Sequence, residues 1–355
     1  HSLSCSIVNG DKNVFKTHLK SFLDTSYVWG KFSVLFLFYF FAFLAIIVLW
    51  FSGKELFMTR DLEYKITAQD NGVTISDYLK KQGFSHAVTV QLKKIPESIL
   101  LNGKWEYMST RLNGGDCLSI HFEETDGSKN IVAADLPLSI CYEDEDILVV
   151  NKPADMPIHP SMNNYDNTLA NAVCHYYQTQ GIPYTFRCVN RLDRDTTGLT
   201  ILAKHLISSA ILNSEVSVRG ISREYLAIVK GFTEDEGTVN APIGRKEGST
   251  IERQIDVLHG ETAITHYKRL AYQDGLSLIS LKLETGRTHQ IRVHMKSIGH
   301  PLIGDFLYNP DFTKINRQAL HSYRLRFTHP VTKKPLVFTA PLPEDMQALF
   351  PEMIL

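Results

Sequence analysis

The segment VNRLDRDTTGLTILAKH, residues 189–205, places two carboxylates among arginines, directly before a turn and an apolar run. Thr196-Thr197-Gly198 predicts the turn, and the apolar residues that follow predict a buried strand. Asp193 lies between Arg191 and Arg194, whose positive charges favour its ionised form. An ionised carboxylate can serve as a nucleophile, a base or an ion-pair partner. Taken alone, the segment favours a paired aspartate that caps the turn.

Several other stretches of the chain have the pattern of strands that end at turns. They are DILVVNKP at 146–153, REYLAIVKG at 223–231, SLISLKLETG at 277–286 and the hairpin-like LRFTHPVTKKPLVFTAP at 325–341. The stretch QIRVHMKSIG at 290–299 has helical spacing instead. Many strands, few helices and long connections predict an α+β domain with a mixed, largely antiparallel sheet over residues 139–355.

Upstream of this domain, residues 58–126 predict a smaller unit, joined to it by a polar linker at 127–138. Ile75, Tyr78 and Leu79 recur at helical spacing, and Gly83 predicts the end of that helix. A second amphipathic stretch follows, and then short strands separated by Asn-Gly turns. This order of elements resembles the S4-type RNA-binding fold, mainly through ILLNGKW and the later GGDCLSI.

Residues 1–57 differ from the rest of the chain. The uncharged, apolar segment 32–51 is long enough to span a bilayer. However, the first Met is Met58, and more than half of the nineteen Phe residues precede it. The preceding GKELF is also compatible with codons of a ribosome-binding site. We therefore expect Met58 to be the native start and residues 1–57 to be upstream sequence, with a membrane anchor through 32–51 as the alternative.

The overall composition restricts the class of protein. The formal net charge of −1 gives no global attraction to nucleic acid, so an RNA partner would require a local basic patch. Five scattered cysteines without a C-x-x-C pair argue against a disulfide framework and a structural zinc site. The sequence thus predicts a cytoplasmic protein with no metal site.

Four motifs, read together, change the interpretation of Asp193. NRLDRDTTGL, REYLAIVKG, LETGRTHQIRVHMKSIGHPLIGDFLY and VVNKPADMPIHP resemble the RluA-type pseudouridine synthases. The resemblance covers about residues 139–345, and the S4-like unit fits the same family. It implies the pseudouridine synthase fold and an isomerase that converts specific uridines of structured RNA to pseudouridine, with no cofactor.

The resemblance also implies roles for individual residues. Asp193 matches the aspartate that attacks the target uridine, Tyr225 the active-site tyrosine that stacks on the uracil, and Arg292 the arginine that pairs with the aspartate. Arg191 matches the arginine that takes the place of the flipped base. Arg287 and His289 are expected to contact RNA.

One position departs from the family pattern. Asn190 stands where the family often has His, so a role for an imidazole there is not expected. The neighbouring Asp195 is expected to be a structural hydrogen-bond acceptor.

The resemblance, through the S4-like unit, favours large-subunit ribosomal RNA over transfer RNA as substrate. We further expect a monomer. The competing interpretation is a catalytically silent RNA-binding protein.

Overall fold

The computed structural model describes residues 58–353. The predicted membrane span 32–51 and the question of the native start therefore lie outside the described residues. Between residues 58 and 353, no helix combines the length and the apolar character that a bilayer crossing requires.

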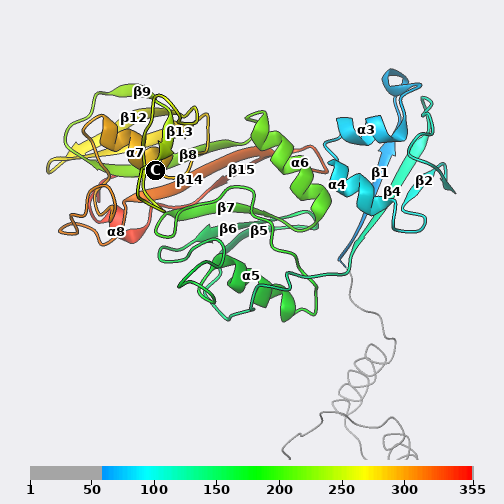
Figure 1. The fold of residues 1–355 in the computed structure, drawn as a ribbon, viewed down its shortest axis with the longest axis horizontal. Coiled ribbons are helices and arrows are strands. Elements are labelled where there is room, and N and C mark those ends of the chain that lie inside the picture. The colour runs from blue at the N-terminus through cyan, green and yellow to red at the C-terminus, as the bar shows by residue number, and fades with distance from the viewer. Residues whose placement is uncertain (1–57, 354–355) are drawn as a thin grey trace, which may run out of the picture. The chain divides into compact units, whose positions relative to one another are not determined.

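The N-terminal unit is a four-stranded sheet in the order β1-β4-β2-β3, with two short helices (Figure 1). Helix α3 (Ile75–Lys81) begins at Thr74, whose hydroxyl accepts from the Asp77 amide, and α4 (His86–Leu92) begins at Ser85 in the same way. The two predicted helices are therefore present. Strand β1 was not predicted from the sequence, yet all eight of its residues pair with β4. The strands are β1 (Met58–Lys65), β2 (Ile99–Leu101), β3 (Lys104–Trp105) and β4 (Cys117–Glu124), and a 3-10 turn η1 covers Ala68–Asp70.

The larger part of the chain is a nine-stranded sheet in the order β5-β6-β7-β14-β8-β13-β12-β9, with β15 paired to β14. Only the β7–β14 contact is parallel, so the predicted mixed, largely antiparallel sheet is confirmed. The strands are β5 (Ile140–Glu143), β6 (Ile147–Lys152), β7 (Thr197–Ala203), β8 (Ser222–Lys230), β9 (Glu236–Asn240), β12 (Ile264–Gln273), β13 (Leu276–Leu283), β14 (Leu320–Thr328) and β15 (Pro335–Thr339). A separate hairpin joins β10 (Ile243–Arg245) to β11 (Arg253–Ile255).

Helices cover both faces of the first strands, which explains why those strands are apolar throughout. Leu148 and Val150 of β6 pack in one cluster with residues of α5 (Leu169–Gln178). Ile147 and Val149 point to the opposite face and pack with Leu212 of α6 (Leu206–Ser217). Figure 1 shows α5 and α6 on the two sides of these strands. The remaining helices are α7 (Gln290–Ser297) and α8 (Glu344–Gln347).

Gly198 allows the parallel contact between β7 and β14. Its φ is +107°, and a Cβ placed there would come within 2.3 Å of the carbonyl oxygen of Ser322. Any side chain at this position would meet both an unfavourable backbone conformation and the backbone of the neighbouring strand. The sheet therefore requires a glycine here. The predicted turn at Thr196-Thr197-Gly198 was wrong in its position, because Thr197 and Gly198 lie within β7 and the turn closes earlier, between Asp193 and Thr196.

We expect Gly198→Ala to lower the free energy of unfolding by about 3 kcal/mol or more, because strain and a backbone clash add together. Urea denaturation would measure this loss. Gly248→Ala is the matched control, since Gly248 also has a positive φ, +73°, but has nothing within 4 Å of the added Cβ. Equal losses in the two variants would contradict the steric explanation.

Candidate active site

Asp193 lies in the loop immediately before β7, as the opening segment suggested. Its carbonyl oxygen accepts a hydrogen bond from the Thr196 amide at 3.1 Å, which closes the turn. Leu192 is buried beside it and anchors the loop in the core. The Asp193 side chain keeps 27% of its surface exposed, so its carboxylate is held in place while remaining open to a ligand.

A buried arginine holds that carboxylate. Arg292, in the first turn of α7, donates from Nη1 to Asp193 Oδ2 at 2.9 Å. Its other edge donates to Asp305, from Nε to Oδ2 at 2.7 Å and from Nη2 to Oδ1 at 2.8 Å. The Arg292 side chain is 1% exposed and that of Asp305 is fully buried. This bidentate pair fixes the orientation of the guanidinium and hence the position of Asp193.

Asp305 is a site residue that the sequence analysis missed. Besides Arg292, its Oδ1 accepts from the amides of Leu307 at 3.0 Å and Tyr308 at 3.1 Å. A carboxylate with four donors is a fixed anion, which offsets the cost of burying the Arg292 charge. The sequence did contain a signal for this residue: in the quoted motif, an acid stands among apolar residues, in PLIGDFLY.

Tyr225 enters the site from the middle of β8, where it pairs with Leu281 of β13 and Ser322 of β14. It is buried, and this burial raises the pKa of its phenol above the ordinary value; the positive charge of Arg223 opposes this rise and the negative charge of Asp193 adds to it. The phenol is therefore protonated at neutral pH. Tyr225 and Asp193 line the same cavities, so the structure brings them together.

His289 also lies close to Asp193. Its φ of +57° places it at the start of α7 in the left-handed region, which is uncommon for a residue other than glycine. Nδ1 contacts the Tyr308 hydroxyl at 2.9 Å, and Nε2 lies 4.0 Å from Asp193 Oδ2. Burial lowers the pKa of His289 although Asp193 raises it, so the ring is neutral at pH 7.

Asp193 and Tyr225 line a groove of about 820 Å³. Arg292 and His289 line a smaller pocket, to which Asp193 and Tyr225 also contribute. The walls of the groove come from the loop before β7, the start of β8, the end of α6 and the loop after β13. Arg191 lies exposed at this groove, and Arg287 lines it while paired with Glu261 and the Thr262 carbonyl. The volume lies within the usual range for a small-molecule site and is sufficient for a nucleotide.

Lys152 is buried although its position suggests otherwise. A lysine after an apolar strand and before a proline is expected to be a solvated strand end or an RNA contact, but this side chain is 1% exposed. Its ammonium group donates to the carbonyls of Pro153, Met156 and Arg194 at 2.7–2.8 Å. Burial lowers its pKa to about 7, although the charges of Asp195 and Asp193 raise it. Lys152 therefore ties the loop that carries Asp193 to the end of β6.

Asn190, at the position where the family often has His, uses its side-chain amide to bind the backbone. Its Nδ2 donates to the Leu199 carbonyl at 3.1 Å, and its Oδ1 accepts from the Ile201 amide at 2.7 Å. Asp195 is buried and accepts from Arg194, in agreement with a structural role. Only Asp193 of the two acids faces the groove.

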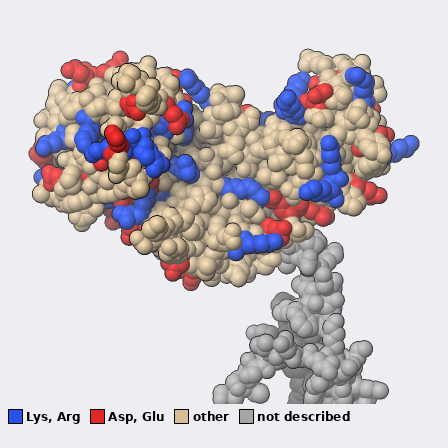
Figure 2. Space-filling view, viewed as in Figure 1, with Lys and Arg blue, Asp and Glu red and all other residues tan. Residues whose placement is uncertain are grey.

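Charge on the surface is mixed. Figure 2 shows basic and acidic side chains interspersed over the face that it draws, with no extended region of one sign. This agrees with the nearly neutral net charge and leaves the recognition of an anionic ligand to local groups such as the arginines of the groove.

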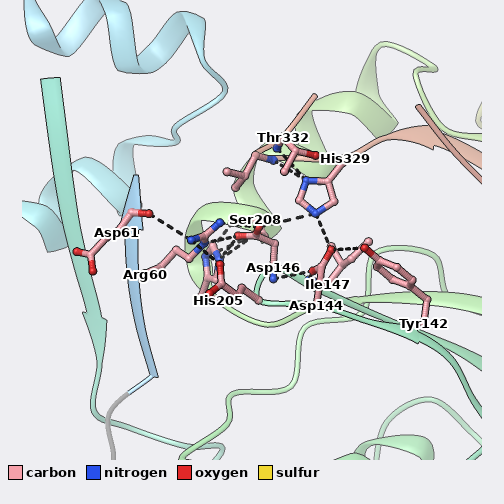
Figure 3. Close-up of polar contacts among 12 residues, drawn as sticks. Arg60, Asp61, Tyr142, Asp144, Asp146, Ile147, His205, Ser208, His329 and Thr332 are labelled. Atoms are coloured by element: carbon pink, nitrogen blue, oxygen red, sulfur yellow. Dashed lines mark hydrogen bonds and ion pairs between the residues drawn. The ribbon is translucent and has the colours of Figure 1, made fainter. Parts of the chain in front are cut away.

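A second polar cluster joins β1 to the larger sheet (Figure 3). Asp144, Asp146 and His329 have potential ligand atoms within 4.8 Å of one another, but each carboxylate already has donors. Asp146 accepts from Arg60 at 2.8 and 3.0 Å and contacts His205 at 2.8 Å. Burial raises the pKa of Asp146, but the contacts with His205 and Arg60 outweigh it and hold the pKa at about 2. The cluster is fully accounted for as a structural ion-pair network.

Comparison with known proteins gives consistent matches. A family model described as RNA pseudouridylate synthase matches residues 146–297. A protein of Bacillus subtilis, described as uncharacterized RNA pseudouridine synthase YjbO, is 41% identical over 278 residues, covering 78% of this chain and 98% of that protein. Ribosomal large subunit pseudouridine synthase D of Salmonella typhimurium is 38% identical over 272 residues, covering 72% and 83%.

A solved structure supports the same assignment of the fold. Human RNA pseudouridylate synthase domain containing 1 matches with a TM-score of 0.50 and 27% identity. The match covers 60% of this chain and 87% of that one.

Proposed function

The chain belongs to the RNA pseudouridine synthase family, and on that premise we propose that it isomerises specific uridines of large-subunit ribosomal RNA, with Asp193 as the attacking group. The enzyme class, an isomerase acting on RNA, follows from the family. The single observation that supports the role of Asp193 is its placement: a partly open carboxylate, fixed by a buried arginine, in the wall of a nucleotide-sized groove.

The reaction exchanges one bond of uracil for another. The bond between the sugar carbon and a ring nitrogen breaks, and a bond from the same sugar carbon to a ring carbon forms. That ring carbon loses a proton and the freed ring nitrogen gains one, so product and substrate have the same atoms and no oxidation or reduction occurs. Attack by Asp193 requires an ionised carboxylate; Arg292 binds its Oδ2, and the side chain remains 27% exposed to a ligand.

Tyr225 supplies an aromatic wall beside the carboxylate. The detached uracil has to remain in the site while it turns, and stacking on a buried ring would hold it. The hydroxyl on that ring makes Tyr225 our candidate to transfer the ring proton, although its raised pKa means that it would act while bonded to the substrate rather than as a free phenolate.

Access to a uridine in structured RNA requires the base to leave its stack, at a cost of a few kcal/mol. The guanidinium of Arg191 is planar and exposed at the groove, so it would fill the vacated position by stacking and hydrogen bonding. Arg287, which lines the groove, and His289, which lines the smaller pocket beside Asp193, would contact the RNA backbone or the flipped nucleotide.

The choice of ribosomal over transfer RNA rests on relatives. The large-subunit enzyme of Salmonella typhimurium carries that substrate in its name. The small N-terminal sheet with its two helices, which we propose to be an S4-like RNA-binding domain over residues 58–126, fits the same choice. We keep residues 127–138 as its linker to the catalytic domain.

Carbodiimide treatment followed by primer extension on RNA from a deletion strain tests this proposal. We expect one or a few stops to disappear from large-subunit ribosomal RNA and to return on complementation with the wild-type gene. If primer-extension stops disappear from transfer RNA alone, the substrate is transfer RNA instead. An unchanged map of both RNAs would favour a catalytically silent RNA-binding protein.

A further inference from the structure

Four arginines line the groove, and they differ in what they contact. Arg219 pairs with Glu284, and Arg287 pairs with Glu261. Within residues 58–353, the side chains of Arg191 and Arg223 make neither a hydrogen bond nor an ion pair, so two guanidinium groups face the groove without an anion. Arg191 already has a proposed role in base flipping. The unassigned group is Arg223.

Arg223 is built into the wall rather than extended into solvent. It stands two residues before Tyr225 on β8, and both side chains reach the same groove. Its guanidinium lies against Gly286, where an added Cβ would come within 2.8 Å of Nη1. Its Nε is buried and has no hydrogen-bond partner among the described residues.

No neighbouring carboxylate of the groove is free to pair with it. Asp193 is held by Arg292, and Glu284 is shared by Arg219 and His266. A half-buried guanidinium whose N–H group lacks an acceptor destabilises the folded protein, unless a ligand accepts a hydrogen bond from that group. A planar donor fork of this kind matches the oxygens of a phosphate group.

We propose that Arg223 binds a phosphodiester oxygen of the RNA next to the flipped uridine. The inference rests on the proposed function, because it takes RNA as the ligand of the groove. With Tyr225 against the uracil, Arg223 on the same strand would hold the backbone at the adjacent phosphate and so set how far the nucleotide enters. Contacts to phosphate position RNA without reading its sequence. Arg223 is thus a positioning residue.

The test is a salt titration of binding to an in vitro transcript of large-subunit ribosomal RNA, with wild type, Arg223→Gln and Arg223→Lys. Each lost phosphate contact removes about 0.7–0.9 from the slope of log affinity against log salt. We expect Arg223→Gln to lose about one such increment and to bind several-fold more weakly, while Arg223→Lys keeps the slope. Because Arg223 has no protein partner, the Tm of Arg223→Gln should equal that of wild type.

The matched control is Arg326→Gln, which removes an exposed arginine of β14. The Arg326 side chain has no partner in the part of the chain that the structure describes, and it does not line the groove. The slope of this variant should remain that of wild type. An unchanged slope in Arg223→Gln, or an equal loss in Arg326→Gln, overturns the inference. Pseudouridine formation by wild type, measured on the same transcript, reports separately on the proposed function. If the slope falls in Arg223→Gln but wild type forms no pseudouridine, the activity is rejected and Arg223 remains a phosphate contact.

Discussion

Asp193→Asn is expected to abolish pseudouridine formation, with a loss of more than about 10⁴-fold in single-turnover rate, while RNA binding persists. The neutral amide keeps the shape of the side chain but is not a nucleophile, and it can still accept a hydrogen bond from Arg292. Liquid chromatography of nuclease-digested RNA would measure the product, and a salt-matched binding assay would measure affinity. Turnover within tenfold of wild type would remove Asp193 as the attacking group.

Asp166→Asn provides the matched control for that change. Asp166 is exposed, and within the described part of the chain it makes no ion pair or side-chain hydrogen bond. The same chemical substitution there should leave the rate and the Tm unchanged. A comparable loss in both variants would indicate a general effect of charge instead of one specific to the groove.

Asp305→Ala is expected to lower the free energy of unfolding by about 3–5 kcal/mol and to impair turnover at least 100-fold. Removal of this carboxylate leaves the fully buried side of Arg292 without its anion, the costliest way to disturb a buried ion pair. The freed guanidinium would no longer present Nη1 to Asp193 at a fixed position. Urea denaturation and single-turnover assays would measure the two losses.

The double variant Arg292→Met/Asp305→Ala separates stability from catalysis. With no charge left buried, we expect at least half of the lost stability to return, because replacing both members of a buried pair costs less than removing one. Turnover should remain low, since Asp193 still lacks its cation. Recovery of activity along with stability would show that Arg292 acts only on the fold.

Local patterns in the chain predicted most of the catalytic sheet. The strands at β6, β7, β8 and β13, helix α7 and the β14–β15 hairpin follow from runs of apolar residues and the turns that bound them. Strand β1 was not predicted, because half of its residues, MTRDLEYK, are charged. They form an eight-residue strand through pairing with β4.

Charged residues in the interior were the hardest to predict. Lys152 follows an apolar strand and precedes a proline, which is typical of a solvated strand end. Its burial depends on three carbonyls, one of which comes from residue 194. Asp305 likewise becomes a site residue only because Arg292 reaches it from α7. A charge is buried when partners from elsewhere in the chain satisfy it, and sequence spacing does not reveal such partners.

By itself, the sequence determined the class of fold, the family and the identity of Asp193, Tyr225 and Arg292 as residues to examine, because periodicity and motifs are properties of neighbouring residues. The tertiary structure decided which acid of the R-L-D-R-D segment faces the groove, what holds Arg292 in place, and which arginines remain unpaired. Those properties depend on contacts between segments about 100 residues apart, such as Asp193 with Arg292. Burial then determines how strongly each contact acts, because low local polarity strengthens charge interactions and penalises any group left without a partner.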